Sequence, residues 1–166
     1  MLNSGGVIIF PTETVYGIGA LLTKEEAVKR IYEIKKRSPD KPLQVLIADP
    51  KQAEALAQEI SKKAQELMGK YWPGPLTLIF KAASGNSVGI RMPKHDWLLK
   101  LIKKTGPLAA SSANLSGEPD PVSAGEVKIE ADLLVDGGKC QLGEASTVVD
   151  VSVDPPLILR EGKIKI

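Results

Sequence analysis

Four short polar segments carry the side chains that could do chemistry. They are PTETVYG at 11–17, KKRSPDKP at 35–42, IRMPKH at 90–95 and SSANLSG at 111–117. Each adjoins an apolar run typical of a strand or the end of a predicted helix, and α/β proteins build sites from loops that a rigid sheet holds in place. The pattern predicts a binding site made from several loops, with four ordinary surface loops as the alternative.

The KKRSPDKP segment is strongly basic. Lys35 and Arg37 close a predicted helix, and Lys41 follows after a turn that contains proline. Cations at a helix C-terminus are favourable by themselves. Lys36 raises the charge density beyond what capping requires, and a polyphosphate would neutralise it. The segment therefore indicates either an anion site or a well-capped helix.

The other segments are rich in neutral polar groups. SSANLSG offers serine hydroxyls, the Asn114 amide and exposed backbone amides, which could bind phosphate or carboxylate oxygens or could form Asx and Ser turns. PTETVYG offers the hydroxyls of Thr12, Thr14 and Tyr16 beside two glycines. Neutral donors of this kind suit a small polar substrate.

Several familiar sites are missing. No G-x-x-x-x-G-K-[ST] motif occurs, and Gly17-Ile18-Gly19 lacks the third glycine of a dinucleotide fingerprint. Cys140 and His95 are each the single residue of their type, so an internal disulfide is impossible and a Cys/His zinc site lacks its ligands. We therefore expect no protein-bound metal and no cysteine nucleophile.

Composition indicates one globular domain spanning 1–166. The chain has 166 residues, 43% hydrophobic and 25% charged, with a formal net charge of +2. No apolar run approaches the roughly 18 to 20 residues that cross a bilayer, and the first residues lack the features of a signal peptide. We expect no membrane association and a cytoplasmic location.

The elements that must position these loops alternate between strands and helices. Apolar and β-branched runs predict strands at 7–10, 43–48, 76–81, 88–92, 108–110, 133–135 and 147–151. Helical periodicity predicts helices at 24–36 capped by Thr23, at 50–71 with a break near Ile60-Ser61, and at 96–104. The segment 12–19 is predicted as a loop. The predicted hairpins among these strands favour an α/β domain with a mixed sheet.

Six motifs in a fixed order resemble the YrdC family over about 5–163. They are FPTETVYGIGA, Lys35-x-Arg37 followed by KPL, WPGPLTLI, IRMPKH, SSANLSG, and ASTVVD with LREG. The resemblance implies a twisted mixed sheet with flanking helices around a basic cavity, in the short single-domain form. It also implies L-threonylcarbamoyladenylate synthase activity on L-threonine, bicarbonate and ATP, with pyrophosphate as co-product and magnesium delivered with ATP. Partner proteins would pass the threonylcarbamoyl group to tRNA.

The resemblance assigns ten side chains to the site. Those expected to face ATP are Lys35, Arg37, Lys41, Ser87, Asn114 and Arg160, with Lys35 and Arg37 as the catalytic pair. Those expected to face threonine or its carbamate are Thr14, Arg91, Ser112 and Ser146. Two departures bear on threonine recognition: Leu46 stands where many relatives have histidine, and Val122 where they have threonine.

Two other functions stay open at this point. A basic cavity could hold the phosphates of tRNA or double-stranded RNA without catalysis, although two Phe, three Tyr and two Trp give few stacking platforms. The chain could also form a carbamoyl-adenylate, as YrdC-like domains of hydrogenase-maturation proteins do. The synthase reaction itself needs no protein nucleophile, because positioning and charge neutralisation can carry phosphoryl transfer.

Overall fold

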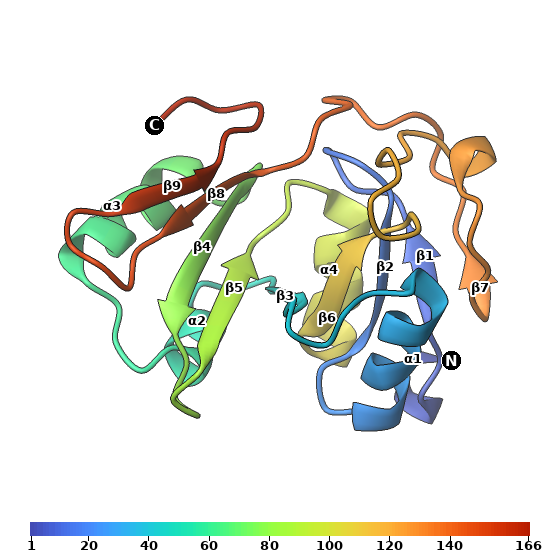
Figure 1. Ribbon diagram of the computed structural model, residues 1–166, viewed down its shortest axis with the longest axis horizontal. Coiled ribbons are helices and arrows are strands. Elements are labelled where there is room, and N and C mark those ends of the chain that lie inside the picture. The colour runs from blue at the N-terminus through green and yellow to red at the C-terminus, as the bar shows by residue number, and fades with distance from the viewer.

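The computed structural model describes residues 1–166, in which nine strands form one continuous sheet (Figure 1). The strand order is β7-β1-β2-β6-β3-β5-β4-β8-β9. The strands are β1 (Ile8–Phe10), β2 (Gly17–Leu21), β3 (Gln44–Leu46), β4 (Leu76–Lys81), β5 (Ser87–Arg91), β6 (Leu108–Ser112), β7 (Leu133–Leu134), β8 (Thr147–Asp150) and β9 (Leu157–Arg160). Five neighbouring pairs are antiparallel and three are parallel. The mixed α/β sheet expected from the sequence is confirmed.

Four α-helices flank the sheet. They are α1 (Glu25–Lys35), α2 (Lys51–Leu56), α3 (Lys62–Tyr71) and α4 (Asp96–Thr105), with short 3-10 turns η1 (Leu2–Ser4) and η2 (Ala124–Glu126). Their apolar faces complete three buried clusters, one with α1, one with α2 and α3, and one with α4. Burying each large aliphatic side chain stabilises the fold by about 1.5 to 3 kcal/mol. No helix has the length and apolar character needed to cross a membrane.

The break predicted in the second helical region is confirmed. Helix α2 ends at Leu56, and Ser61 caps α3 by accepting a hydrogen bond from the Ala64 amide at 3.2 Å. The predicted cap at Thr23 is wrong. Helix α1 begins one residue later, with Lys24 at the N-cap and no side-chain cap, because the Lys24 amide closes a turn onto the Leu21 carbonyl.

Two strands differ from the sequence-based prediction. Strand β2 begins within the last three residues of the segment expected to be a loop, and β9 was not expected. The glycines of β2 pack directly on the Phe10 ring, where a Cβ on Gly17 would lie 2.9 Å from a ring carbon. This tertiary contact overrides the low strand propensity of glycine.

One face of the sheet is only partly covered by a helix. At one end of this face Leu46, paired with Leu108, packs in the cluster that contains α4. At the other end Gln44 pairs with Ala110, and a cavity opens beside both. Side chains alternate along a strand. The residues paired with Gln44 on the neighbouring strands therefore lie on the same uncovered face.

Candidate active site

The cavity has a volume of about 270 Å³ and draws its walls from segments far apart in the sequence. Six of the ten predicted site residues line it: Thr14, Arg37, Arg91, Ser112, Ser146 and Arg160. Its floor includes Gly89 of β5, where an added Cβ would lie 3.0 Å from the Ile79 side chain. The bare glycine therefore keeps the floor of the cavity open.

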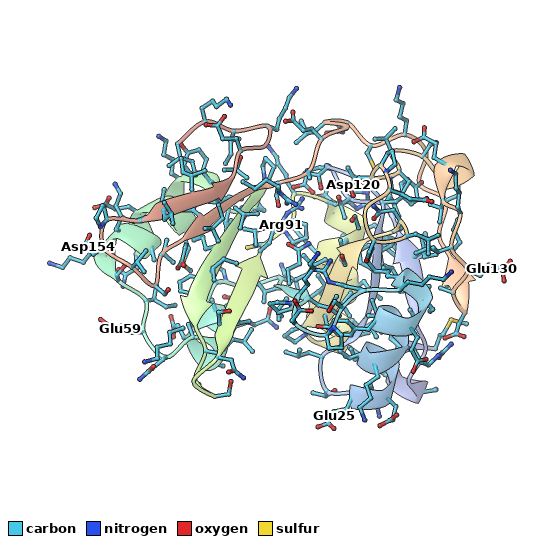
Figure 2. All side chains as sticks on the ribbon, in the orientation of Figure 1. Glu25, Glu59, Arg91, Asp120, Glu130 and Asp154 are labelled. Carbon is cyan, nitrogen blue, oxygen red and sulfur yellow. The ribbon has the colours of Figure 1, made fainter.

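The charge on the cavity wall is predominantly positive. Three arginines, Arg37, Arg91 and Arg160, face a single carboxylate, that of Asp120. Figure 2 shows Arg91 near the centre of the molecule and Asp120 on the loop that follows β6, whereas the labelled carboxylates Glu25, Glu59, Glu130 and Asp154 lie at the periphery. An anionic ligand would find its complementary charge in this cavity.

Backbone carbonyls hold Arg37 in place. Its Nε donates to the Lys41 carbonyl at 2.8 Å, and its Nη2 donates to the Pro42 carbonyl at 3.1 Å. The Lys41 side chain is exposed and does not line the cavity. Lys41 therefore contributes its backbone to this arrangement, while the free Nη1 of Arg37 remains for a ligand.

Arg160 is oriented by the segment before β8. Its Nε and Nη2 donate to the Ser146 carbonyl at 3.0 and 2.9 Å, and the Ser146 hydroxyl lies 2.8 Å from that of Thr77. Burial lowers the pKa of Arg160, and the nearby Arg91 charge lowers it further against an opposing effect of Asp120. The residue is thus exposed overall but partly desolvated where it lines the cavity, and the Asp120 carboxylate acts on its charge more strongly than Arg91 does.

Lys35 lies beneath the cavity wall. Its side chain is buried, and Nζ donates to the Ser112 carbonyl at 2.5 Å and to the Asn114 carbonyl at 2.6 Å. Burial, followed by the Arg37 charge, lowers the pKa of Lys35 from 10.5 to about 8. Asn114 is buried beside it and accepts from the Ser112 hydroxyl at 2.6 Å. In this structure Lys35 and Asn114 therefore shape the loop that presents Ser112.

Ser87 lies apart from the other predicted residues. It is exposed at the start of β5, opposite Lys81, while Arg91 at the end of the same strand reaches the cavity. Four residues of an extended strand separate the two positions by roughly 13 Å. The structure does not bring Ser87 onto the cavity wall.

The hydroxyl hydrogen of Thr14 is already committed. Thr12 donates its hydroxyl to the Val15 carbonyl at 2.7 Å, so in the 2.8 Å Thr12–Thr14 contact Thr14 must be the donor. Thr14 also accepts a hydrogen bond from Nη2 of Arg91 at 3.0 Å. Toward a ligand Thr14 can therefore act as an acceptor for an N–H or O–H group.

The Tyr16 hydroxyl serves the fold. It donates to the Gly138 carbonyl at 2.8 Å and accepts from the Gly137 amide at 3.1 Å. Burial raises the pKa of Tyr16. Its expected contribution to substrate binding is replaced by a structural contact that holds the turn after β7.

Sequence reasoning missed four residues at or beside the site. Gln44, Thr77 and Asp120 line the cavity, and Glu13 forms an ion pair with Arg91. The first two carry a readable signal, since each is a polar residue that interrupts an apolar strand at the alternating position. Asp120 and Glu13 carry none, because nothing in the sequence says which acidic loop residue turns inward.

Of the two departures from the YrdC pattern, Leu46 lies beside the site and Val122 does not line it. Leu46 is buried and lines a small hollow that also includes Thr14 and Arg91, so an apolar group stands next to two predicted threonine ligands. Val122 is half-buried and packs against the cluster around α1. Nowhere do three His, Cys, Asp or Glu side chains come close enough together to hold a metal ion.

Comparison with known proteins identifies the family. The model of the Sua5/YciO/YrdC family, described as "Telomere recombination", matches residues 1–162. The chain belongs to this family. A "Putative threonylcarbamoyl-AMP synthase" of Methanocaldococcus jannaschii is 34% identical over 98% of the chain and 83% of its own length. The "Threonylcarbamoyl-AMP synthase" of Pyrococcus abyssi is 45% identical over 97% of the chain.

Solved structures of the Sua5/YciO/YrdC family share the fold. The P. abyssi Sua5 structure complexed with L-threonine superposes with a TM-score of 0.91 at 44% identity, covering 97% of the chain and 52% of that protein. Escherichia coli YciO superposes with a TM-score of 0.85 at 24% identity, which supports the fold alone. The chain spans about half the length of the P. abyssi and Bacillus subtilis relatives.

Proposed function

We propose that this chain is an L-threonylcarbamoyladenylate synthase that joins L-threonine, bicarbonate and ATP into threonylcarbamoyl-AMP and pyrophosphate. The observation that carries the proposal is the single cavity at which Thr14, Arg37, Arg91, Ser146 and Arg160 meet. The names of relatives at 34% and 45% identity support it. Residues 1–166 would act as one YrdC-like domain in the cytoplasm, and partner proteins would transfer the product to tRNA.

The charge of the cavity fits the proposed substrates. A triphosphate carries about four negative charges near neutral pH, and arginine forks bind phosphate and carboxylate oxygens in pairs of hydrogen bonds. Arg37 and Arg160 would face the phosphates, and Arg91 would face the threonine carboxylate. Ser112 and Ser146 would add neutral hydrogen bonds, and Lys35 would support the loop from below.

The reaction would proceed without a protein nucleophile. Threonine and bicarbonate would first lose water and form N-carboxythreonine, whose carbamate oxygen then attacks the α-phosphorus of ATP. A new P–O bond forms while the bond to the β-phosphate oxygen breaks, and pyrophosphate leaves. The arginines stabilise the charge that develops on the phosphate oxygens and hold the reactants in line.

Magnesium would come with ATP. The cavity offers arginines, hydroxyls and one carboxylate, a donor set that suits a metal carried by phosphates better than a metal held by protein ligands alone. Asp120 is the single carboxylate on the wall that could approach such an ion. Bound magnesium would supply charge neutralisation on the phosphates.

A direct assay tests the proposal. Purified protein with ATP and magnesium should release pyrophosphate only when threonine and bicarbonate are both present, and mass spectrometry should detect threonylcarbamoyl-AMP. Carbamoyl phosphate in place of threonine and bicarbonate tests the carbamoyl-adenylate reaction. RNA affinity that falls steeply with salt, without any ATP turnover, would instead support an RNA-binding module. ATP turnover independent of threonine would refute the proposed function.

A further inference from the structure

Glu13 is a buried carboxylate with an unusual environment. Its side chain is 5% exposed, and Oε1 lies 2.7 Å from Nη2 of Arg91, whose side chain is 4% exposed. Neither carboxylate oxygen accepts a hydrogen bond of good geometry. A buried ion pair without further hydrogen bonds adds little to stability, because desolvating both charges offsets their attraction. Stability alone therefore does not account for a glutamate at this position.

The two partners border different hollows of the molecule. Arg91 lines the cavity, whereas Glu13 lines a separate hollow together with Lys94 and His95 and is absent from the cavity wall. Glu13 therefore contacts the guanidinium from the side away from the cavity. Its neighbour Thr14 lines the cavity, and residues 13–15 form a bend in which the Thr12 hydroxyl accepts hydrogen bonds from the Thr14 and Val15 amides.

Three protein groups fix the plane of the Arg91 guanidinium. Its Nε donates to the Gly74 carbonyl at 3.2 Å, and its Nη2 contacts both Thr14 Oγ1 and Glu13 Oε1. No protein acceptor takes a hydrogen bond from Nη1. A planar fork that is held at two nitrogens can present the third in one direction only.

We propose that Glu13 is a positioning residue, which holds Arg91 from behind so that Nη1 faces the carboxylate of bound threonine. The inference rests on the proposed function and adds to it a residue that never touches the substrate. The competing explanation is a purely structural ion pair, whose removal would lower stability and leave the threonine affinity of the folded protein unchanged.

A double-mutant cycle separates these explanations. Glu13→Gln keeps the size of the side chain and removes its charge, and Arg91→Lys keeps the cation and removes the planar fork. Glu13→Gln should raise the KM for threonine about tenfold, a coupling typical of groups in contact, and leave the KM for ATP unchanged. In the Arg91→Lys background, Glu13→Gln should raise the KM for threonine by less than about twofold. Glu13→Asp should restore part of the affinity.

Calorimetric titration with threonine alone gives a readout that does not require turnover. Asp132→Asn is the matched control, because it neutralises the carboxylate of the Arg30–Asp132 ion pair away from the cavity and should leave both KM values unchanged. Thermal unfolding of each variant shows which ones fold. If Glu13→Gln unfolds, Glu13→Asp and the double variant still provide the comparison.

The outcomes distinguish this inference from the proposed function. Threonine affinity unaffected by Glu13→Gln, or equal losses in both backgrounds, would overturn the positioning role while leaving the synthase proposal intact. A wild-type protein that binds threonine and shows the predicted coupling, yet releases no pyrophosphate, would overturn the synthase proposal alone. A wild-type protein that binds no threonine would overturn both.

Discussion

Replacing Lys35 by methionine should remove a pH dependence from the stability of the fold. Burial lowers the pKa of Lys35 to about 8, whereas the unfolded chain keeps the ordinary value of 10.5. Between these two values the unfolded chain holds a proton that the folded chain has released, so the free energy of unfolding rises with pH. Above pH 10.5 Lys35 is neutral in both states and burial of its charge costs no stability. As the pH falls from 10.5 to about 8 the cost of burying the ammonium grows to its full value.

The pKa difference sets the size of the effect. A depression of about 2.5 at about 1.36 kcal/mol per pKa unit corresponds to about 3.4 kcal/mol in full. About 2.5 kcal/mol of this should appear between pH 7 and pH 10. Other groups also titrate in this range, so the difference between wild type and Lys35→Met is the quantity to compare.

Urea denaturation followed by the fluorescence of the buried Trp72 provides the measurement. Unfolding free energies at pH 7, 8, 9 and 10 should rise more steeply for the wild type than for Lys35→Met. Parallel curves would show that the Ser112 and Asn114 carbonyls stabilise the ammonium enough to keep its ordinary pKa. Burial would then not lower the pKa of Lys35.

Three further predictions follow from individual side chains. Arg37→Ala should lower kcat/KM for ATP about a hundredfold and keep the free energy of unfolding within about 1 kcal/mol of the wild type. The control Lys63→Ala, remote from the cavity, should retain activity. Normal turnover by Arg37→Ala would contradict the assignment of Arg37 to the site. Lys36→Gly should raise stability by about 0.5 to 1 kcal/mol, because Lys36 is exposed and adopts a left-handed conformation at φ 49°; an unchanged or lower melting temperature would argue against strain there. Cys140 is buried with a raised pKa, so iodoacetamide at pH 7.5 should label it far more slowly in the folded protein than in urea; equal rates would refute this.

The sequence predicted the elements whose signals are local. The apolar runs at 76–81 and 88–92 became β4 and β5 with shifts of at most one residue, and Ser61 separates α2 from α3 as expected. Strand β2 was missed because its glycines gain their place from contact with the Phe10 ring. Strand β9 follows Pro155-Pro156 and exposes all four residues, so it lacks the alternation that marks a half-buried strand.

The candidate site was predictable at the level of loops and less so at the level of atoms. The motif order placed Thr14, Arg91 and Ser146 in one site, and the structure brings them to one cavity. The burial of Lys35 could not be inferred, because a lysine at a helix end usually extends into solvent. The inward turn of Glu13 depends on Arg91, which lies 78 residues later in the chain.

The brevity of β3 has a mechanical consequence. This three-residue strand alone joins β6 on one side to β5 on the other, through six paired positions. The strands β7-β1-β2-β6 lie on one side of β3, and β5-β4-β8-β9 lie on the other. A change in tilt between these two portions therefore acts on the six paired positions and changes the width of the cavity. A ligand that contacts both Ser112 of β6 and Thr77 of β4 connects the two portions of the sheet and restricts this motion. Amide exchange at Gln44–Leu46 is the place to observe the resulting stiffening.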